Sequence, residues 1–150
     1  MKPYEILQRH WVATRAGVLT IKLDESDVAT LEVKYKIWLP TDFREYLLRS
    51  CPKNYLEMDN DSTDWWQLAR IKNITEEYRC AIRNPIVATN VEKYLFFADY
   101  AIWCWAWVIA CGDGDDRGRV VVVNGTDDRF VADSFTQFID RYVVDVRQVA

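Results

Sequence analysis

YLFFADYAIWCWAWVIAC, residues 94–111, is the most apolar part of the chain. Asp99 interrupts this stretch, which is also shorter than the roughly twenty apolar residues that a transmembrane helix needs. Residues 95–98 predict a short buried strand. Residues 102–111 alternate between large and small side chains, which is the period of a second strand. The stretch therefore predicts β-sheet and no membrane span.

The second of these strands has two unlike faces. Its large side chains share one face and are Trp103, Trp105, Trp107 and Ile109. The small side chains of the opposite face leave room for a helix layer. We expect the tryptophan face to be core that helices cover, and the alternative is an apolar cavity for a ligand.

The chain continues as an antiparallel meander. Residues 112–116 (GDGDD) predict a turn, and residues 120–123 predict another buried strand. Asn124-Gly125 is a strong hairpin signal, after which residues 130–132 return antiparallel.

The last helix is the clearest in the sequence. Ser134 and Gln137 are spaced as a capping box at its start. Its apolar side chains recur at helical spacing and form one stripe: Phe135, Phe138, Ile139, Tyr142, Val143 and Val146. A stripe of this kind packs on a sheet. In a chain of 150 residues that is half apolar and has no repeats or linkers, these elements predict a single α+β domain, residues 1–150.

Further helices are predicted before the sheet. Residues 4–16 fit an amphipathic helix that Gly17 ends. A second helix starts at Asp24 and has one buried face: Val28, Leu31, Tyr35 and Trp38. Pro40 ends it, because proline disfavours the α conformation in the residue before it.

The middle of the chain predicts two more helices. Thr41 is a natural N-cap for the first, which Pro52 stops. The buried face of this helix holds Phe43, Tyr46 and Leu47. Beyond the polar loop 59–64, a further helix is predicted to start near Thr75 and to close at Asn84-Pro85.

Composition argues against several classes of function. The net charge of −4 comes without any run of basic residues, so nucleic acid is not an expected partner. The N-terminal residues do not form an export signal, so we expect a cytoplasmic protein. The four cysteines form no C-x-x-C pair and His10 is the only histidine, so we expect buried thiols, no metal and no cofactor.

No catalytic arrangement is evident in the sequence. A serine or cysteine nucleophile would have only His10 as its base. The acidic segments 59–64 and 113–116 lack the glutamate that closes a calcium loop. Gly112-x-Gly114 leads into a strand instead of a helix and offers no phosphate cradle. We therefore expect a binding protein and no enzyme.

The ordered set of motifs resembles the SUKH superfamily, which includes fungal regulators of the Knr type and bacterial immunity proteins. The residues that carry the resemblance are Leu39-Pro40, Asp42 to Leu48, Trp66-Gln67-Leu68, Phe97-Ala98-Asp99, and Val131 to Phe135 with Phe138. It covers residues 24–145, so residues 1–23 are expected to be an N-terminal helical extension. One departure is the Arg49 to Asn54 segment, where the family usually has glycine.

The resemblance implies a strongly bent, mainly antiparallel sheet with helices packed on one side. For bacterial members it implies an immunity protein (antitoxin) that binds and neutralises a cognate toxin domain, often a nuclease. It brings no catalytic motif with it. Two alternatives stay open: an intracellular regulatory scaffold of the same fold, and a small enzyme that binds its ligand behind the tryptophan face.

The expected interface lies on the acidic loops. Trp65 and Trp66 are consecutive, so one of them is expected to point outward beside the acidic loop 59–64. An exposed aromatic within a charged rim is typical of a protein interface. The residues expected to contact a basic partner are Asp61, Asp64, Trp65, Asp113, Asp115 and Asp116.

Overall fold

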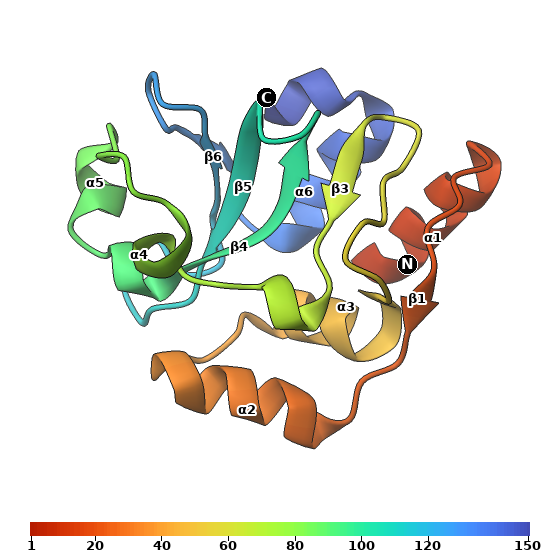
Figure 1. Ribbon diagram of the computed structural model, residues 1–150, viewed down its shortest axis with the longest axis horizontal. Helices are drawn as coiled ribbons and strands as arrows, with labels where there is room; N and C mark the ends of the chain where they lie inside the picture. Colours follow the sequence, from red (N-terminus) through yellow and green to blue (C-terminus); the bar gives the residue numbers. More distant parts are fainter.

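A computed structural model describes all 150 residues and has a five-stranded antiparallel sheet at its centre (Figure 1). The strands follow in chain order: β3 (Thr63–Trp65), β4 (Tyr94–Tyr100), β5 (Trp105–Ala110), β6 (Val120–Val123) and β7 (Phe130–Ala132). Register shifts at Phe96/Ala98 and at Val120/Val121 bend this sheet. A two-stranded sheet pairs β1 (Thr20–Ile21) with β2 (Cys51–Pro52). The predicted α+β fold with its meander is confirmed.

The long helices lie on one side of the sheet (Figure 1). They are α1 (Pro3–Ala13), α3 (Thr41–Ser50) and α6 (Phe135–Val144). Ser134 caps α6 by accepting a hydrogen bond from the Gln137 amide, as its sequence predicts. Helix α2 (Glu25–Tyr35) packs on α3 and forms the lower edge of the molecule in Figure 1.

The tryptophan face of β5 is filled core where the helices cover it. Trp107 contacts Phe138 of α6, with ring centroids 5.5 Å apart, and its indole N–H donates to the Val149 carbonyl at 2.7 Å. Phe97 of β4 lies 5.4 Å from the same Phe138 ring. Helices therefore cover the large side chains, which removes the structural basis for a ligand cavity behind Trp107.

The strand predicted over residues 102–111 begins later than expected, because Trp103 lies in a turn. Ala101, Ile102 and Trp103 all have positive φ angles, of 47°, 56° and 64°, and form a left-handed turn between β4 and β5. This turn reverses the side on which Trp103 lies, and its ring packs 5.1 Å from Phe96 on the opposite face of the sheet. Alternation therefore begins only at Trp105.

The second predicted helix ends earlier than its spacing suggested. Lys36 adopts a left-handed conformation (φ 54°) and stops α2 after Tyr35. No helix is present between Lys36 and Pro40, and proline disfavours the α conformation in the residue before it. Trp38 was expected on the buried face of this helix, but it is 72% exposed.

Residues 66–93 differ most from expectation. In place of one helix from Thr75 to Asn84 there is a single turn, α4 (Ile74–Glu77), and a second turn, α5 (Pro85–Ala88), begins after Asn84. Asn84 does not close a helix: its side chain caps the start of α5. Three 3₁₀ turns complete the secondary structure: η1 (Leu68–Arg70), η2 (Val91–Lys93) and η3 (Val146–Val149).

All four cysteines are free thiols. Cys51 and Cys111 are buried as expected, whereas Cys80 and Cys104 are exposed, because both lie in connecting segments outside the sheet and the long helices. No helix combines the length and the apolar character that crossing a membrane demands.

Candidate protein-binding face

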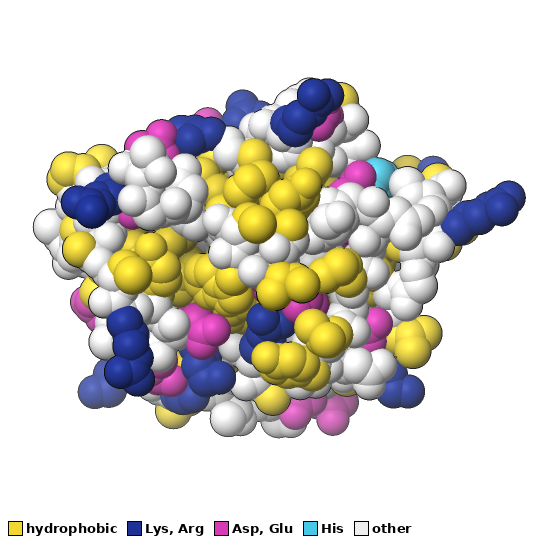
Figure 2. All heavy atoms as spheres, turned by 45° about the horizontal axis from the view of Figure 1, so that its top comes forward, with side chains coloured by type: hydrophobic (Ala, Val, Ile, Leu, Met, Phe, Trp, Pro, Cys, Tyr) yellow, Lys and Arg dark blue, Asp and Glu magenta, His cyan; other side chains and the backbone are white.

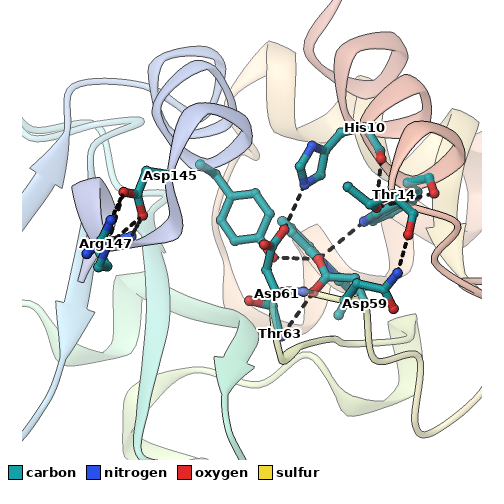
Figure 3. A network of polar contacts seen from close by, with 11 residues as sticks. His10, Thr14, Asp59, Asp61, Thr63, Asp145 and Arg147 are labelled. Carbon is teal, nitrogen blue, oxygen red and sulfur yellow. Dashed lines mark hydrogen bonds and ion pairs between the residues drawn. The ribbon is translucent and has the colours of Figure 1, made fainter.

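The acidic loop 57–64 folds inward around Asp59, which is only 5% exposed (Figure 3). Its carboxylate accepts hydrogen bonds from the indole N–H of Trp65 at 2.8 Å, from that of Trp11 at 3.4 Å, and from the Tyr142 hydroxyl. These donors come from β3, α1 and α6. Asp59 therefore joins three distant parts of the chain and is a structural residue.

Asp61, in the same loop, also has a partner within the chain. Its carboxylate lies 2.7 Å from Nε2 of His10, the only histidine, and Figure 3 shows the pair between α1 and the loop. The neighbouring Asn60 side chain donates to the Thr14 carbonyl. Asp61 retains about a third of its side-chain exposure, at 32%, but its carboxylate already has a hydrogen-bond partner.

Asp64 is buried in an ion-pair network. Arg70 lies 2.6 Å from Asp64 and 3.2 Å from Asp99, and its guanidinium stacks over the Trp66 ring at 4.1 Å. Burial raises the pKa of Asp64, and the hydrogen bond from Arg70 offsets part of that rise. The network fixes η1 against the sheet.

The expectation that one of the two consecutive tryptophans is exposed is wrong. Trp65 and Trp66 are both completely buried. Trp65 lies under the helices, 5.2 Å from Tyr142, while Trp66 packs 5.8 Å from Phe96 on the other face of the sheet. Residues 66–93 cover that second face, which the sequence pattern did not reveal. Asp64 and Trp65 are thus unsuited to contact a partner directly.

The second acidic segment, the turn 112–117 after β5, lies at the surface. Asp113 and Asp115 are exposed, and neither carboxylate has an ion-pair or hydrogen-bond partner in the chain. Asp116 differs because the Tyr94 hydroxyl donates to it. Burial raises the pKa of Tyr94, and the hydrogen bond to Asp116 adds to the rise. Two of the three predicted acidic residues here are therefore free to bind.

Arg117 joins this turn to the segment that carries Trp38. Its guanidinium donates to the Trp38 carbonyl at 2.5 Å and to the Leu39 carbonyl at 3.2 Å. It also reaches the Cys111 carbonyl at 3.4 Å. Two segments 79 residues apart in sequence are thereby held side by side.

An apolar groove continues from Trp38 along α2. It has a volume of about 470 Å³ and is lined by Ala29, Glu32, Val33, Lys36, Ile37 and Trp38. Val33 is 77% exposed and Trp38 is 72% exposed. We use the name Trp38 face for Val33, Trp38, Asp113 and Asp115 together. The sequence concealed this face because Trp38 fits the helical spacing of the buried residues before it.

Another exposed apolar side chain lies at the far end of β5. Ile102, in the left-handed turn, is 85% exposed, and the rings of Tyr100 and Trp105, which flank the turn in sequence, stack 4.2 Å apart. Figure 2 shows hydrophobic side chains gathered on the face of the molecule that includes this end of the sheet. No charged residue occurs between Tyr100 and Cys111.

The structure is a small α+β domain with an exposed aromatic and exposed carboxylates on its surface. The chain belongs to the SMI1 / KNR4 family (SUKH-1), whose family model matches residues 22–141. The predicted resemblance over residues 24–145 is thus confirmed, and α1 lies outside the matched segment. A search of curated proteins found no significant match.

Proposed function

We propose that this chain is a non-catalytic immunity protein that binds and neutralises the effector domain of a cognate toxin. Family membership supports the binding role, because a SUKH domain is compatible with an immunity-type protein. The observation that carries the proposal is the Trp38 face, where Arg117 holds the segment of the 72% exposed Trp38 against the turn that carries the exposed Asp113 and Asp115. Such a combination is typical of an interface anchor with a charged rim.

The remaining polar clusters have structural roles, which favours binding over catalysis. His10 pairs with Asp61, and the Asp59 carboxylate has its hydrogen-bond donors within the chain. Arg70 lies between two buried carboxylates. These groups hold α1, the acidic loop and η1 in place.

Co-expression tests the proposed function. The chain is produced together with the product of the reading frame immediately upstream of its gene, which the proposal predicts to be a toxin, and cell survival and co-purification are both measured. We expect protection and a stable complex, and Asp140→Lys, at an exposed site on α6, serves as the control that retains both. A complex without protection would instead indicate a regulatory scaffold of the same fold. Absence of both would refute the proposal.

A further inference from the structure

We propose that the groove along α2 receives an acidic segment of the partner protein. An apolar side chain of that segment lies against Trp38, and its carboxylates face Lys36. This inference rests on the proposed function, because it requires that the chain binds a protein. It adds which surface is used and which chemistry recognises it. The exposed aspartates of the turn 112–117 would favour a basic partner, whereas the charges that contact the groove favour an acidic one.

The groove is an open, mostly apolar hollow of about 470 Å³ on the outer side of α2, at the lower edge of the molecule in Figure 1. Four of its six lining residues are hydrophobic: Ala29, Val33, Ile37 and Trp38. All of these except Ile37 are exposed. Exposed apolar side chains gathered around a hollow are typical of a surface that binds a segment of another protein.

Trp38 has the properties of an anchor residue in this groove. Its side chain is exposed, but its backbone is fixed: Arg117 binds the carbonyls of residues 38 and 39, and Lys93 Nζ donates to the Lys36 carbonyl at 2.9 Å. A large aromatic on an ordered backbone loses little conformational entropy when it binds. Tryptophan is also enriched among interface hot spots.

The groove has one free charge, and it is positive. Its two charged lining residues are Glu32 and Lys36. The Glu32 carboxylate is engaged within the chain, because it accepts a hydrogen bond from the Leu39 amide at 3.0 Å and lies 3.5 Å from Arg44. The Lys36 side chain is exposed and has no ion-pair or hydrogen-bond partner. An acidic group on the partner would therefore find its counter-charge at Lys36.

Two further cations contact the segment that carries Trp38. Arg117 donates only to carbonyl oxygens, which orient the guanidinium but leave its positive charge in place. Lys93 also donates to a carbonyl, and it shares a separate polar pocket with Asp113 and Asp116, which balance its charge there. Neither of these aspartates lines the groove. Lys36 and Arg117 are thus the unbalanced charges in contact with this segment.

Lys36 is an unusual residue for its position, which supports a role outside the fold. It ends α2 in the left-handed conformation, with φ 54°. Glycine adopts that conformation without steric cost and is the usual residue at such a helix end. Within the chain, the exposed lysine side chain gains only its interaction with the helix dipole. An ammonium group that binds a carboxylate of the partner accounts for a lysine here.

The test uses the purified product of the reading frame immediately upstream, which the proposed function predicts to be a toxin. Trp38→Ala removes the anchor, Lys36→Glu reverses the free charge, and Lys36→Gly removes that charge together with the backbone strain. Asp113→Asn with Asp115→Asn tests the opposite sign. Lys22→Glu, at an exposed lysine before α2, and Ile102→Ala, at the other exposed apolar site, are the controls.

Association and dissociation rates are measured at about 20 mM and about 300 mM salt, where screening differs strongly. We expect Trp38→Ala to weaken affinity by about 30-fold or more, mainly through faster dissociation. Lys36→Glu should slow association by about tenfold at low salt and much less at high salt. Lys36→Gly should slow association less than Lys36→Glu does, while thermal unfolding shows it to be at least as stable as the wild type. The aspartate variant should associate at least as fast as the wild type, and both controls should bind unchanged.

Three results would overturn the inference and leave the proposed function standing, because the wild type would still bind and protect. In the first, the aspartate variant associates slowly and Lys36→Glu does not, so the partner is basic. In the second, Trp38→Ala binds as the wild type does. In the third, sedimentation of the chain alone shows a dimer that Trp38→Ala dissociates, so a second copy occupies the groove. If the wild type neither binds nor protects, both proposals fall.

Discussion

At the scale of single residues, the acidic side chains divide into two groups with different roles. Asp59 is buried and receives hydrogen bonds from two indoles and a phenol, whereas Asp113 is exposed and has no partner. A buried carboxylate is stable only where donors replace the water it has lost. Asp59 therefore contributes to folding, and Asp113 is available to a partner.

Asp59→Asn tests the structural half of this division. Asparagine keeps the size of the side chain but replaces one acceptor oxygen by an amino group, which faces N–H or O–H donors whichever way the amide is turned. We expect the free energy of unfolding to fall by about 2–4 kcal/mol, because buried donors lose a charged acceptor. Urea denaturation measures it. Asp140→Asn, at an exposed site on α6, should change it by less than about 0.5 kcal/mol.

The acidic segments could be identified from the sequence, but which of their carboxylates are buried or paired and which are free could not. Asp61, Asp64, Asp113 and Asp115 are the same residue type in similar polar stretches. Which of them has a side-chain partner depends on His10 and Arg70, and His10 lies 51 residues from Asp61 in sequence. Pairings of this range follow from tertiary packing, which local patterns do not contain. The acidic turn was therefore predictable and its free charge was not.

At the scale of elements, the left-handed turn 101–103 is an unusual connection between β4 and β5. Three consecutive residues other than glycine have positive φ, and Ile102 among them is β-branched. The left-handed conformation costs roughly 1–2 kcal/mol for an L-residue. The turn is held by hydrogen bonds from the Trp103 amide to Asp99 at 2.9 Å and from the Ala101 amide to the Ser62 carbonyl at 2.8 Å.

Ile102→Gly is expected to stabilise the protein. Glycine adopts φ 56° without steric cost, and the 85% exposed isoleucine side chain contributes little burial. Relief of the strain exceeds the entropy that glycine adds to the unfolded chain, so we expect a gain of about 0.5–1 kcal/mol. Thermal unfolding measures it, with Ile102→Val as a control that stays β-branched and should gain nothing. A loss of stability in Ile102→Gly would show that the isoleucine side chain stabilises the turn.

Some elements followed from the sequence and others did not. Helix α6 and the β6–β7 hairpin were predicted because their caps, turn residues and apolar period agree. Trp38 was misplaced because it continues the helical period beyond the left-handed Lys36. Trp103 was misplaced because it extends the strand period back into the left-handed turn, where its own φ is 64°. Lysine and isoleucine rarely adopt a positive φ, so these residue types do not indicate a left-handed backbone in the sequence.

At the scale of the whole molecule, the core contains several buried tyrosine and cysteine side chains. Tyr46 is 1% exposed and its hydroxyl has no hydrogen-bond partner, while Tyr142 donates to Asp59. Burial raises the pKa of Cys51 to about 12 and that of Tyr46 well above its ordinary value of 10.0. Burial also raises the pKa of Tyr142. These groups fold in their protonated forms.

The buried tyrosines and cysteines predict loss of stability at alkaline pH. The unfolded chain releases their protons near pH 9 for cysteine and pH 10 for tyrosine, whereas the folded chain retains them. Above those values the unfolded state binds fewer protons than the folded state, so the free energy of unfolding falls as pH rises. Below pH 9 these groups are protonated in both states, so their full contribution to the free energy of unfolding is present. Urea midpoints between pH 7 and pH 11 measure the slope.

Tyr46→Phe isolates one of these groups. Because the Tyr46 hydroxyl is buried without a partner, removing it should leave stability at pH 7 unchanged or raise it by about 1 kcal/mol. Above pH 10 the variant should lose stability less steeply than the wild type, by up to about 1.4 kcal/mol per pH unit, which is the effect of one proton. Parallel curves for the two proteins would mean that Tyr46 ionises equally in both states, and hence that water reaches this part of the core.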